Sequence, residues 1–145
     1  SVQFNIHFSF NDKKNILKKI AKNYGYEVID ESLEQFLYFD TPGNYLNYLT
    51  FLEDSNINLS GNLLQCIYYF IENYKTKKDI NLLSFISTFV EYFYNDLSIR
   101  NSSNINVYFN KKYKILNLIN DTKKFNLDIK NLLTSINKIL KDETR

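Results

Sequence analysis

The sequence predicts a single α+β domain, in which an N-terminal β-strand and a small sheet pack against a bundle of about five helices. Three observations support this fold class. The chain has 145 residues, the usual size of one domain. Apolar and polar residues alternate strictly over residues 2–10, and several later segments repeat apolar residues at helical spacing. No Gly- or Pro-rich linker divides residues 1–145, so we expect one domain.

The strands are predicted from alternation. In 2–10, the residues Val2, Phe4, Ile6, Phe8 and Phe10 alternate with polar residues, so Phe4, Ile6 and Phe8 should be buried on one face. Segments 26–29 and 35–39 are expected to be short extended pieces.

Alternation returns in 105–109, where the lysine pair at 111–112 would turn the chain into a hairpin with 113–119. The spacing of Ile115, Leu118 and Ile119 also suits a helix, so this last segment has two interpretations.

The helices are predicted from caps and period. A first helix starts at Asn11-Asp12 and ends before Gly25, and a second starts at Thr41-Pro42 and ends near residue 54. Two long helices, 62–75 and 80–97, are apolar around most of their circumference, so we expect a central antiparallel pair. Their predicted caps are Ser60 and Asp79, and Asp128 caps a last helix with a clean apolar stripe.

The residue inventory argues against most catalytic sites. His7 is the only histidine and Cys66 the only cysteine, which is too few for a zinc site or a His-pair nuclease site. The three glycines stand far apart, so there is no phosphate loop or dinucleotide fingerprint. The neighbouring acids Asp30, Glu31 and Glu34 are the one carboxylate group of interest, and such clusters are usually solvated surface. We therefore expect a protein without enzymatic activity, metal or cofactor.

The apolar segments indicate the compartment. The stretches 63–71 and 85–94 are too short to span a bilayer and are interrupted by Gln65 and Glu91. No signal-peptide pattern precedes the first predicted strand. We expect a cytoplasmic protein with no membrane partner. The abundance of Asn, Lys, Ile, Tyr and Phe matches AT-rich codons, which weakens arguments from lysine number alone.

The charge is distributed unevenly. Net charge is +2, but residues 1–22 carry +4, residues 23–74 carry −8 without a single Lys or Arg, and residues 75–145 carry +6. If several of these acids share a face, their field would attract a basic partner, and tyrosines interleaved with them would supply contact area. The predicted partner-binding residues are Tyr26, Glu27, Asp30, Glu31, Glu34, Tyr38, Asp40 and Tyr45.

This pattern leads to a hypothesis of a protein-binding domain. Its most concrete form is an inhibitor of the immunity or antitoxin kind that blocks a basic toxin such as a nuclease. The opposing interpretation is that the acids pair with lysines within the fold.

Two other classes remain open. Lysine clusters could bind nucleic acid, with Tyr108 and Tyr113 stacking on bases. The candidate phosphate-binding residues are Lys14, Lys18, Lys19, Lys22, Lys111 and Lys112. The third class is a viral or parasite helical protein that grips a host peptide in a groove between apolar helices.

Overall fold

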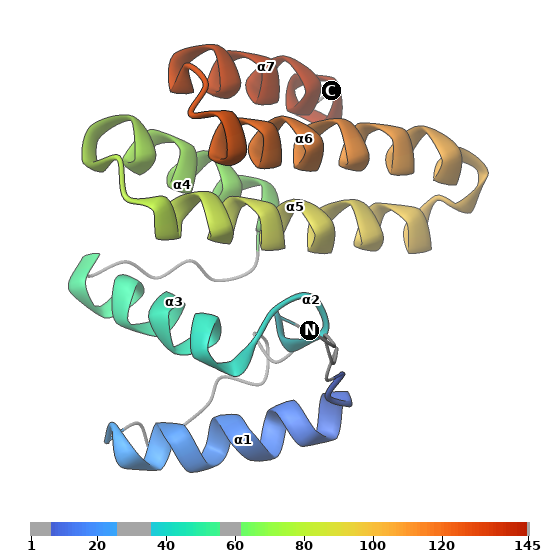
Figure 1. The fold of residues 1–145 in the computed structure, drawn as a ribbon. Coiled ribbons are helices and arrows are strands. Elements are labelled where there is room, and N and C mark those ends of the chain that lie inside the picture. The colour runs from blue at the N-terminus through green and yellow to red at the C-terminus, as the bar shows by residue number, and fades with distance from the viewer. Residues whose placement is uncertain (1–6, 26–35, 56–61, 145) are drawn as a thin grey trace, which may run out of the picture. The chain divides into compact units, whose positions relative to one another are not determined.

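The computed structural model describes residues 7–25, 36–55 and 62–144, and 88% of these are helical, with no strand among them (Figure 1). The predicted α+β fold with a sheet is therefore wrong. The described residues form α1 (Phe10–Asn23), α2 (Phe36–Phe39), α3 (Pro42–Ser55), α4 (Leu63–Lys77), α5 (Ile80–Arg100), α6 (Ile105–Phe125) and α7 (Ile129–Lys141), with 3₁₀ turns η2 (Ser102–Asn104) and η3 (Asp142–Thr144).

The chain divides into two compact units, Ser1–Asn58 with α1–α3 and Leu59–Arg145 with α4–α7. The expectation that 1–145 behaves as one domain stays a prediction, because two compact units can still unfold together.

In the first unit, α2 and α3 both pack on α1. α1 begins at a capping box, where the Ser9 hydroxyl accepts the amide N–H of Asp12 at 3.2 Å and the Asp12 carboxylate accepts the N–H of Ser9 at 3.3 Å. Asp12 is thus the third helical residue and not the predicted cap. Gly25, with φ +80°, follows the helix end as predicted. The interior places Phe36 against Tyr45 and Tyr48, at ring distances of 5.5 and 5.6 Å.

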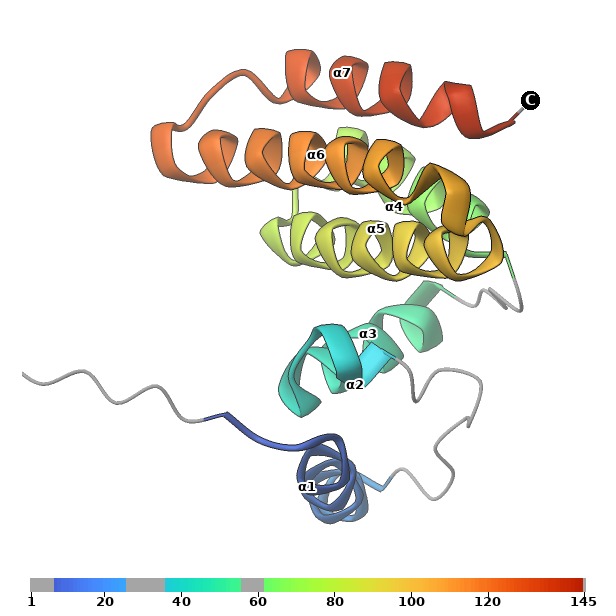
Figure 2. The same cartoon turned by 90° about the vertical axis from the view of Figure 1, so that its right-hand side faces the viewer.

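In the second unit, successive helices alternate in direction, as the colour gradient from α4 to α7 shows (Figure 1). Both views place α6 beside α5 and α7 beside α6 (Figures 1 and 2). The predicted pair of long helices is confirmed as the α4–α5 hairpin, in which the Phe70 ring contacts the rings of both Phe85 and Phe89.

Local signals define the helix ends of this second unit. Asp79 caps α5 and Asp128 caps α7, each by accepting the backbone N–H two residues later, at 2.9 and 3.0 Å. Both caps were predicted. Asn62 caps α4, whereas the predicted cap Ser60 lies outside the described residues.

The predicted N-terminal strand is wrong over residues 7–10, the part of it that the structure describes. Residues 1–6 lie outside the described part, but residues 7–9 are not extended in a sheet and Phe10 begins α1. Phe8, which we expected to be buried, is 52% exposed. The physical reason is the capping box, because it satisfies the first amide groups of a helix inside the alternating segment.

The other strand predictions are also corrected. Segment 26–29 lies outside the described residues, while 36–39 forms the short helix α2, with the adjacent side chains of Phe36 and Leu37 both buried. Residues 105–119 belong to α6, which confirms the helical interpretation of 113–119. The buried residues of α6 are Tyr108, Ile115, Ile119 and Thr122. This stripe has a helical period, and a continuous helix satisfies its own backbone without a partner strand.

Candidate functional site

The predicted acidic surface is described only in part. Tyr26, Glu27, Asp30, Glu31 and Glu34 lie outside the described residues, whereas Tyr38, Asp40 and Tyr45 lie within the first unit. The structure therefore shows the C-terminal end of the predicted site, where α2 meets α3.

Tyr38 has an exposed aromatic side chain. It is 62% exposed, and its ring stacks on that of Phe10 with centroids 4.1 Å apart and planes 10° apart. Such stacking restricts the ring without burying it. The two preceding residues of α2, Phe36 and Leu37, point into the interior, so the helix directs the side chain of Tyr38 outward.

The segment that carries Tyr38 is anchored by a lysine. Lys13 Nζ donates to the carbonyl oxygens of Leu37 at 2.9 Å and Asp40 at 3.1 Å. Carbonyl groups at the end of a helix have no partner inside that helix, so a lysine there satisfies them and complements their partial negative charge. The backbone that presents Tyr38 is thus tied directly to α1.

Asp40 serves the start of α3. Its Oδ1 accepts the backbone N–H of Thr41 and the side-chain Nδ2 of Asn44, both at 2.8 Å. The Thr41 hydroxyl accepts the N–H of Asn44 at 3.2 Å, as the predicted Thr-Pro start implies. Asp40 is half-buried and follows Tyr38 by two residues in the chain, and its carboxylate is used in these local hydrogen bonds.

Tyr45 belongs to the interior. It is fully buried, and its ring meets that of Phe36 edge to face. The interpretation of Tyr45 as a surface contact does not fit this position. The sequence could not separate Tyr38 from Tyr45, because both are tyrosines within the same acidic segment.

The predicted lysine clusters lie in different units. Lys18, Lys19 and Lys22 are exposed on α1, and Lys14 of the same helix is half-buried. Lys111 and Lys112 lie on α6 in the second unit.

The two α6 lysines have neighbours within their own unit. Lys111 pairs with Glu143 and lies 3.9 Å from Asp142, which ties η3 to α6. Lys112 Nζ lies over the rings of Phe109, at 4.6 Å, and Tyr113, at 5.6 Å. Tyr108, one of the two proposed stacking residues, is buried. These contacts weaken the α6 part of the nucleic-acid interpretation, since Lys111 is paired and Tyr108 is buried, whereas Lys18, Lys19 and Lys22 on α1 are exposed.

The described residues include neither a reactive thiol nor a metal-binding group. Cys66 is buried in α4, and burial raises the pKa of its thiol to about 11, so it is protonated at neutral pH. Within the described ranges, no group of three or more His, Cys, Asp or Glu side chains is placed to hold a metal ion. None of the described helices is both long and apolar enough to cross a membrane.

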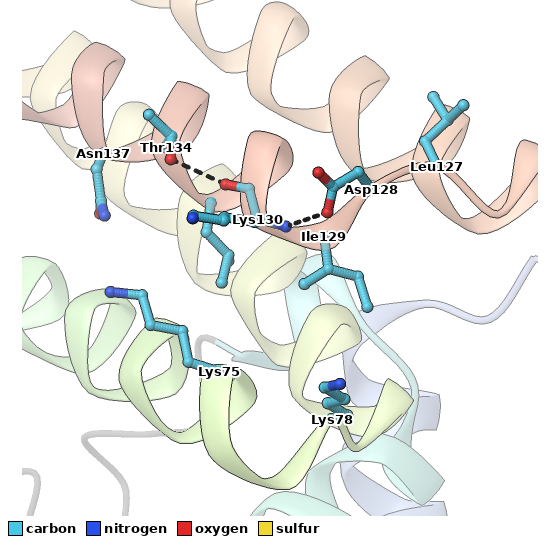
Figure 3. Close-up of a pocket in the computed structure, with 9 residues that line it drawn as sticks. Lys75, Lys78, Leu127, Asp128, Ile129, Lys130, Thr134 and Asn137 are labelled. Carbon is cyan, nitrogen blue, oxygen red and sulfur yellow. Dashed lines mark hydrogen bonds between the residues drawn. The ribbon is translucent and has the colours of Figure 1, made fainter.

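Sequence reasoning missed a pocket in the second unit. It has a volume of about 590 Å³ and lies between the end of α4 and the start of α7 (Figure 3). Its lining residues are Lys75, Lys78, Leu127, Asp128, Ile129, Lys130, Leu133, Thr134 and Asn137. The lysine-rich link at 75–78 was visible in the sequence, but its partner surface on α7 was not.

Comparison of the chain with protein-family models, with curated proteins and with solved structures finds no match.

Proposed function

We propose that this chain is a non-enzymatic protein-binding domain that docks a basic protein through Tyr38 and the acidic segment 23–74. Its most concrete form is an inhibitor of the immunity or antitoxin kind that blocks a basic toxin. The observation that carries the proposal is the anchored, outward-facing ring of Tyr38, which is 62% exposed and stacked on Phe10.

An anchored aromatic residue suits a binding hot spot. Binding costs conformational entropy for every side chain that must be immobilised, and this cost is smaller when the free protein already holds the ring in place. Tyrosine adds a large apolar face and a hydroxyl that can hydrogen-bond at the edge of an interface. The stacking on Phe10 and the Lys13 bonds to the α2 backbone supply that restriction here.

The acidic segment of the sequence that contains Tyr38 supports a basic partner. Segment 23–74 contains eight acidic residues and no Lys or Arg. In the described part of the first unit, Glu53 and Asp54 are exposed near the end of α3. A field of one sign speeds the encounter with an oppositely charged protein and sets a steep salt dependence of the association rate.

The experiment starts with affinity capture from the native host, followed by binding kinetics with the purified partner. Tyr38→Ala should weaken binding by about 30-fold, mostly through faster dissociation, which corresponds to a hot spot of about 2 kcal/mol. Tyr113→Ala is the matched control, because Tyr113 is 61% exposed but lies on α6 outside the acidic segment. Its affinity should equal that of the wild type.

A second variant tests the charge. Simultaneous replacement of Glu27, Glu31 and Glu34 by Lys should slow association and flatten its salt dependence, while far-UV circular dichroism stays unchanged. Equal affinities of the Tyr38→Ala and Tyr113→Ala variants would contradict the proposal. So would a captured partner that is acidic and binds the charge-reversed protein more tightly.

A further inference from the structure

The pocket between α4 and α7 gathers three lysines from two distant parts of the chain. Lys75 lies in the last turn of α4, Lys78 is the residue that ends this helix, and Lys130 lies in the first turn of α7. Figure 3 shows the α4 lysines on one side of the pocket and the α7 residues on the other. A pocket of about 590 Å³ has the size of sites for small organic molecules.

The positive charge of this pocket is only partly compensated. Lys75 pairs with Glu72 at 2.7 Å on the surface of α4. Lys78 and Lys130 form no ion pair with any residue in the described part of the chain. The unit as a whole carries thirteen basic and eight acidic residues, a net charge of +5. An anion in the pocket would therefore gain from the near lysines and from the surrounding field.

Asp128 also lines the pocket, where its negative carboxylate offsets one of the lysine charges. Its carboxylate accepts the N–H of Lys130 at 3.0 Å and so occupies the N-terminus of α7. The lysine side chains, and not the helix end, are consequently the groups available to a ligand.

The pocket also has an apolar side and one orphaned polar atom. Leu127, Ile129 and Leu133 contribute apolar lining. Asn137 Oδ1 is buried and has no hydrogen-bond partner among the described residues. Buried polar atoms are nearly always paired, so an unpaired one beside a pocket indicates a place for a ligand's polar group.

We propose that this pocket binds a small phosphate monoester with an apolar body. The phosphate lies between Lys78 and Lys130, the apolar body rests on Leu127 and Ile129, and a ligand hydroxyl donates to Asn137 Oδ1. Phosphate is favoured over carboxylate because the cations are lysines, which act as point charges toward phosphate. Planar carboxylates are better matched by the fork of an arginine, and the pocket lining contains no arginine among the described residues.

The test uses 1-naphthyl phosphate as the probe, titrated into the full chain and followed by ¹H–¹⁵N NMR. The amide signals of residues 127–137 should shift with saturation at millimolar or lower concentration. Inorganic phosphate and neutral 1-naphthol should each bind at least about tenfold more weakly, because the first lacks the apolar body and the second lacks the anionic group. Affinity should fall as salt is raised.

The decisive variant combines Lys78→Asn with Lys130→Gln. Asn tolerates the left-handed backbone of residue 78, which has φ 51°, so this change removes charge without straining the link. The double variant should bind the probe at least about tenfold more weakly. Lys114→Gln, at an exposed lysine on α6, is the matched single-charge control and should bind like the wild type.

Several outcomes would overturn the proposal. These are the absence of saturable shifts at the pocket, equal binding of naphthol and naphthyl phosphate, or equal affinity of the double variant and the Lys114→Gln control. The urea midpoints of all variants are measured in parallel, so that loss of binding is assigned to the pocket and not to unfolding.

Discussion

The replacement of Phe89 by Ala tests the packing of the second unit most directly. Phe89 lies on α5, is 1% exposed, and its ring centroid is 5.2 Å from that of Phe70 on α4. A buried Phe removes about 150–250 Å² from water, and at about 25 cal/mol per Å² this burial is worth about 4–6 kcal/mol. The alanine methyl keeps part of this area, so the expected loss is about 3–5 kcal/mol, including the cavity that remains.

The assay is urea unfolding followed by far-UV circular dichroism, which reports on the helices. Phe125→Ala is the matched control, because it removes the same ring from the end of α6, where Phe125 is 60% exposed with Lys124 over its face. Its expected cost is about 1 kcal/mol or less. If the two variants unfold at the same urea concentration, α5 does not pack against α4 through Phe89, and the arrangement of the α4–α5 hairpin is wrong.

Further predictions concern single positions. Gly25→Ala should destabilise the chain by about 1 kcal/mol because φ is +80°. Gly43→Ala lies within the first turn of α3, and its added methyl group would come no closer than 4.0 Å to the Thr41 hydroxyl, so it should stabilise the chain by about 0.5–1 kcal/mol; equal urea midpoints would contradict both. The Cys66 thiol should react with a disulfide reagent at neutral pH only as fast as the chain unfolds. As pH rises above 9.0, the unfolded thiol ionises while the folded one stays protonated up to about 11, so stability should fall, and this component should vanish in Cys66→Ala. Glu143→Gln should cost about 1–2 kcal/mol in thermal or urea unfolding, because Lys111 loses the nearer of its two charged partners in η3; an unchanged midpoint would show that this pair is not formed.

The η3 turn, which the Lys111–Glu143 pair ties to α6, also lies near the interior of the second unit. Tyr94 on α5 is buried, and its burial, with Glu143 and Asp142 nearby, raises the pKa of its hydroxyl. The acidic η3 turn therefore lies close to α5 as well as to α6. A function of Lys111 in phosphate binding would require the loss of this contact.

The ends of several helices were determined by the sequence alone, because they depend on chemistry within a few residues. Asp79 and Asp128 bind the first amide groups of α5 and α7, and Gly25 supplies a left-handed backbone after α1. The central pair of helices likewise followed from the apolar residues of 62–75 and 80–97, and Phe89 in the second of them is buried. These features need no knowledge of distant residues.

Fold class was decided by tertiary structure. Alternation over 105–109 fits a strand, yet these residues continue into 115–122, whose buried side chains have a helical period. A strand requires a partner to satisfy its backbone, and a five-residue alternation contains no information about that partner. A helix satisfies its backbone internally and needs only one apolar face against a neighbour, which α5 provides.

For the candidate sites too, the sequence determined the residue types, and the tertiary structure determined which of them are exposed or close together. The sequence alone established that 23–74 lacks Lys and Arg and is rich in tyrosine. Only packing separated exposed Tyr38 from buried Tyr45, because Phe36 and Leu37 fill the interior and turn the next residue outward. The pocket could not be predicted from local patterns either. Lys78 and Lys130 lie at the ends of different helices, and these ends come together only when α7 folds back along α6. Burial and convergence are properties of many distant contacts, and a local pattern of residue types does not contain them.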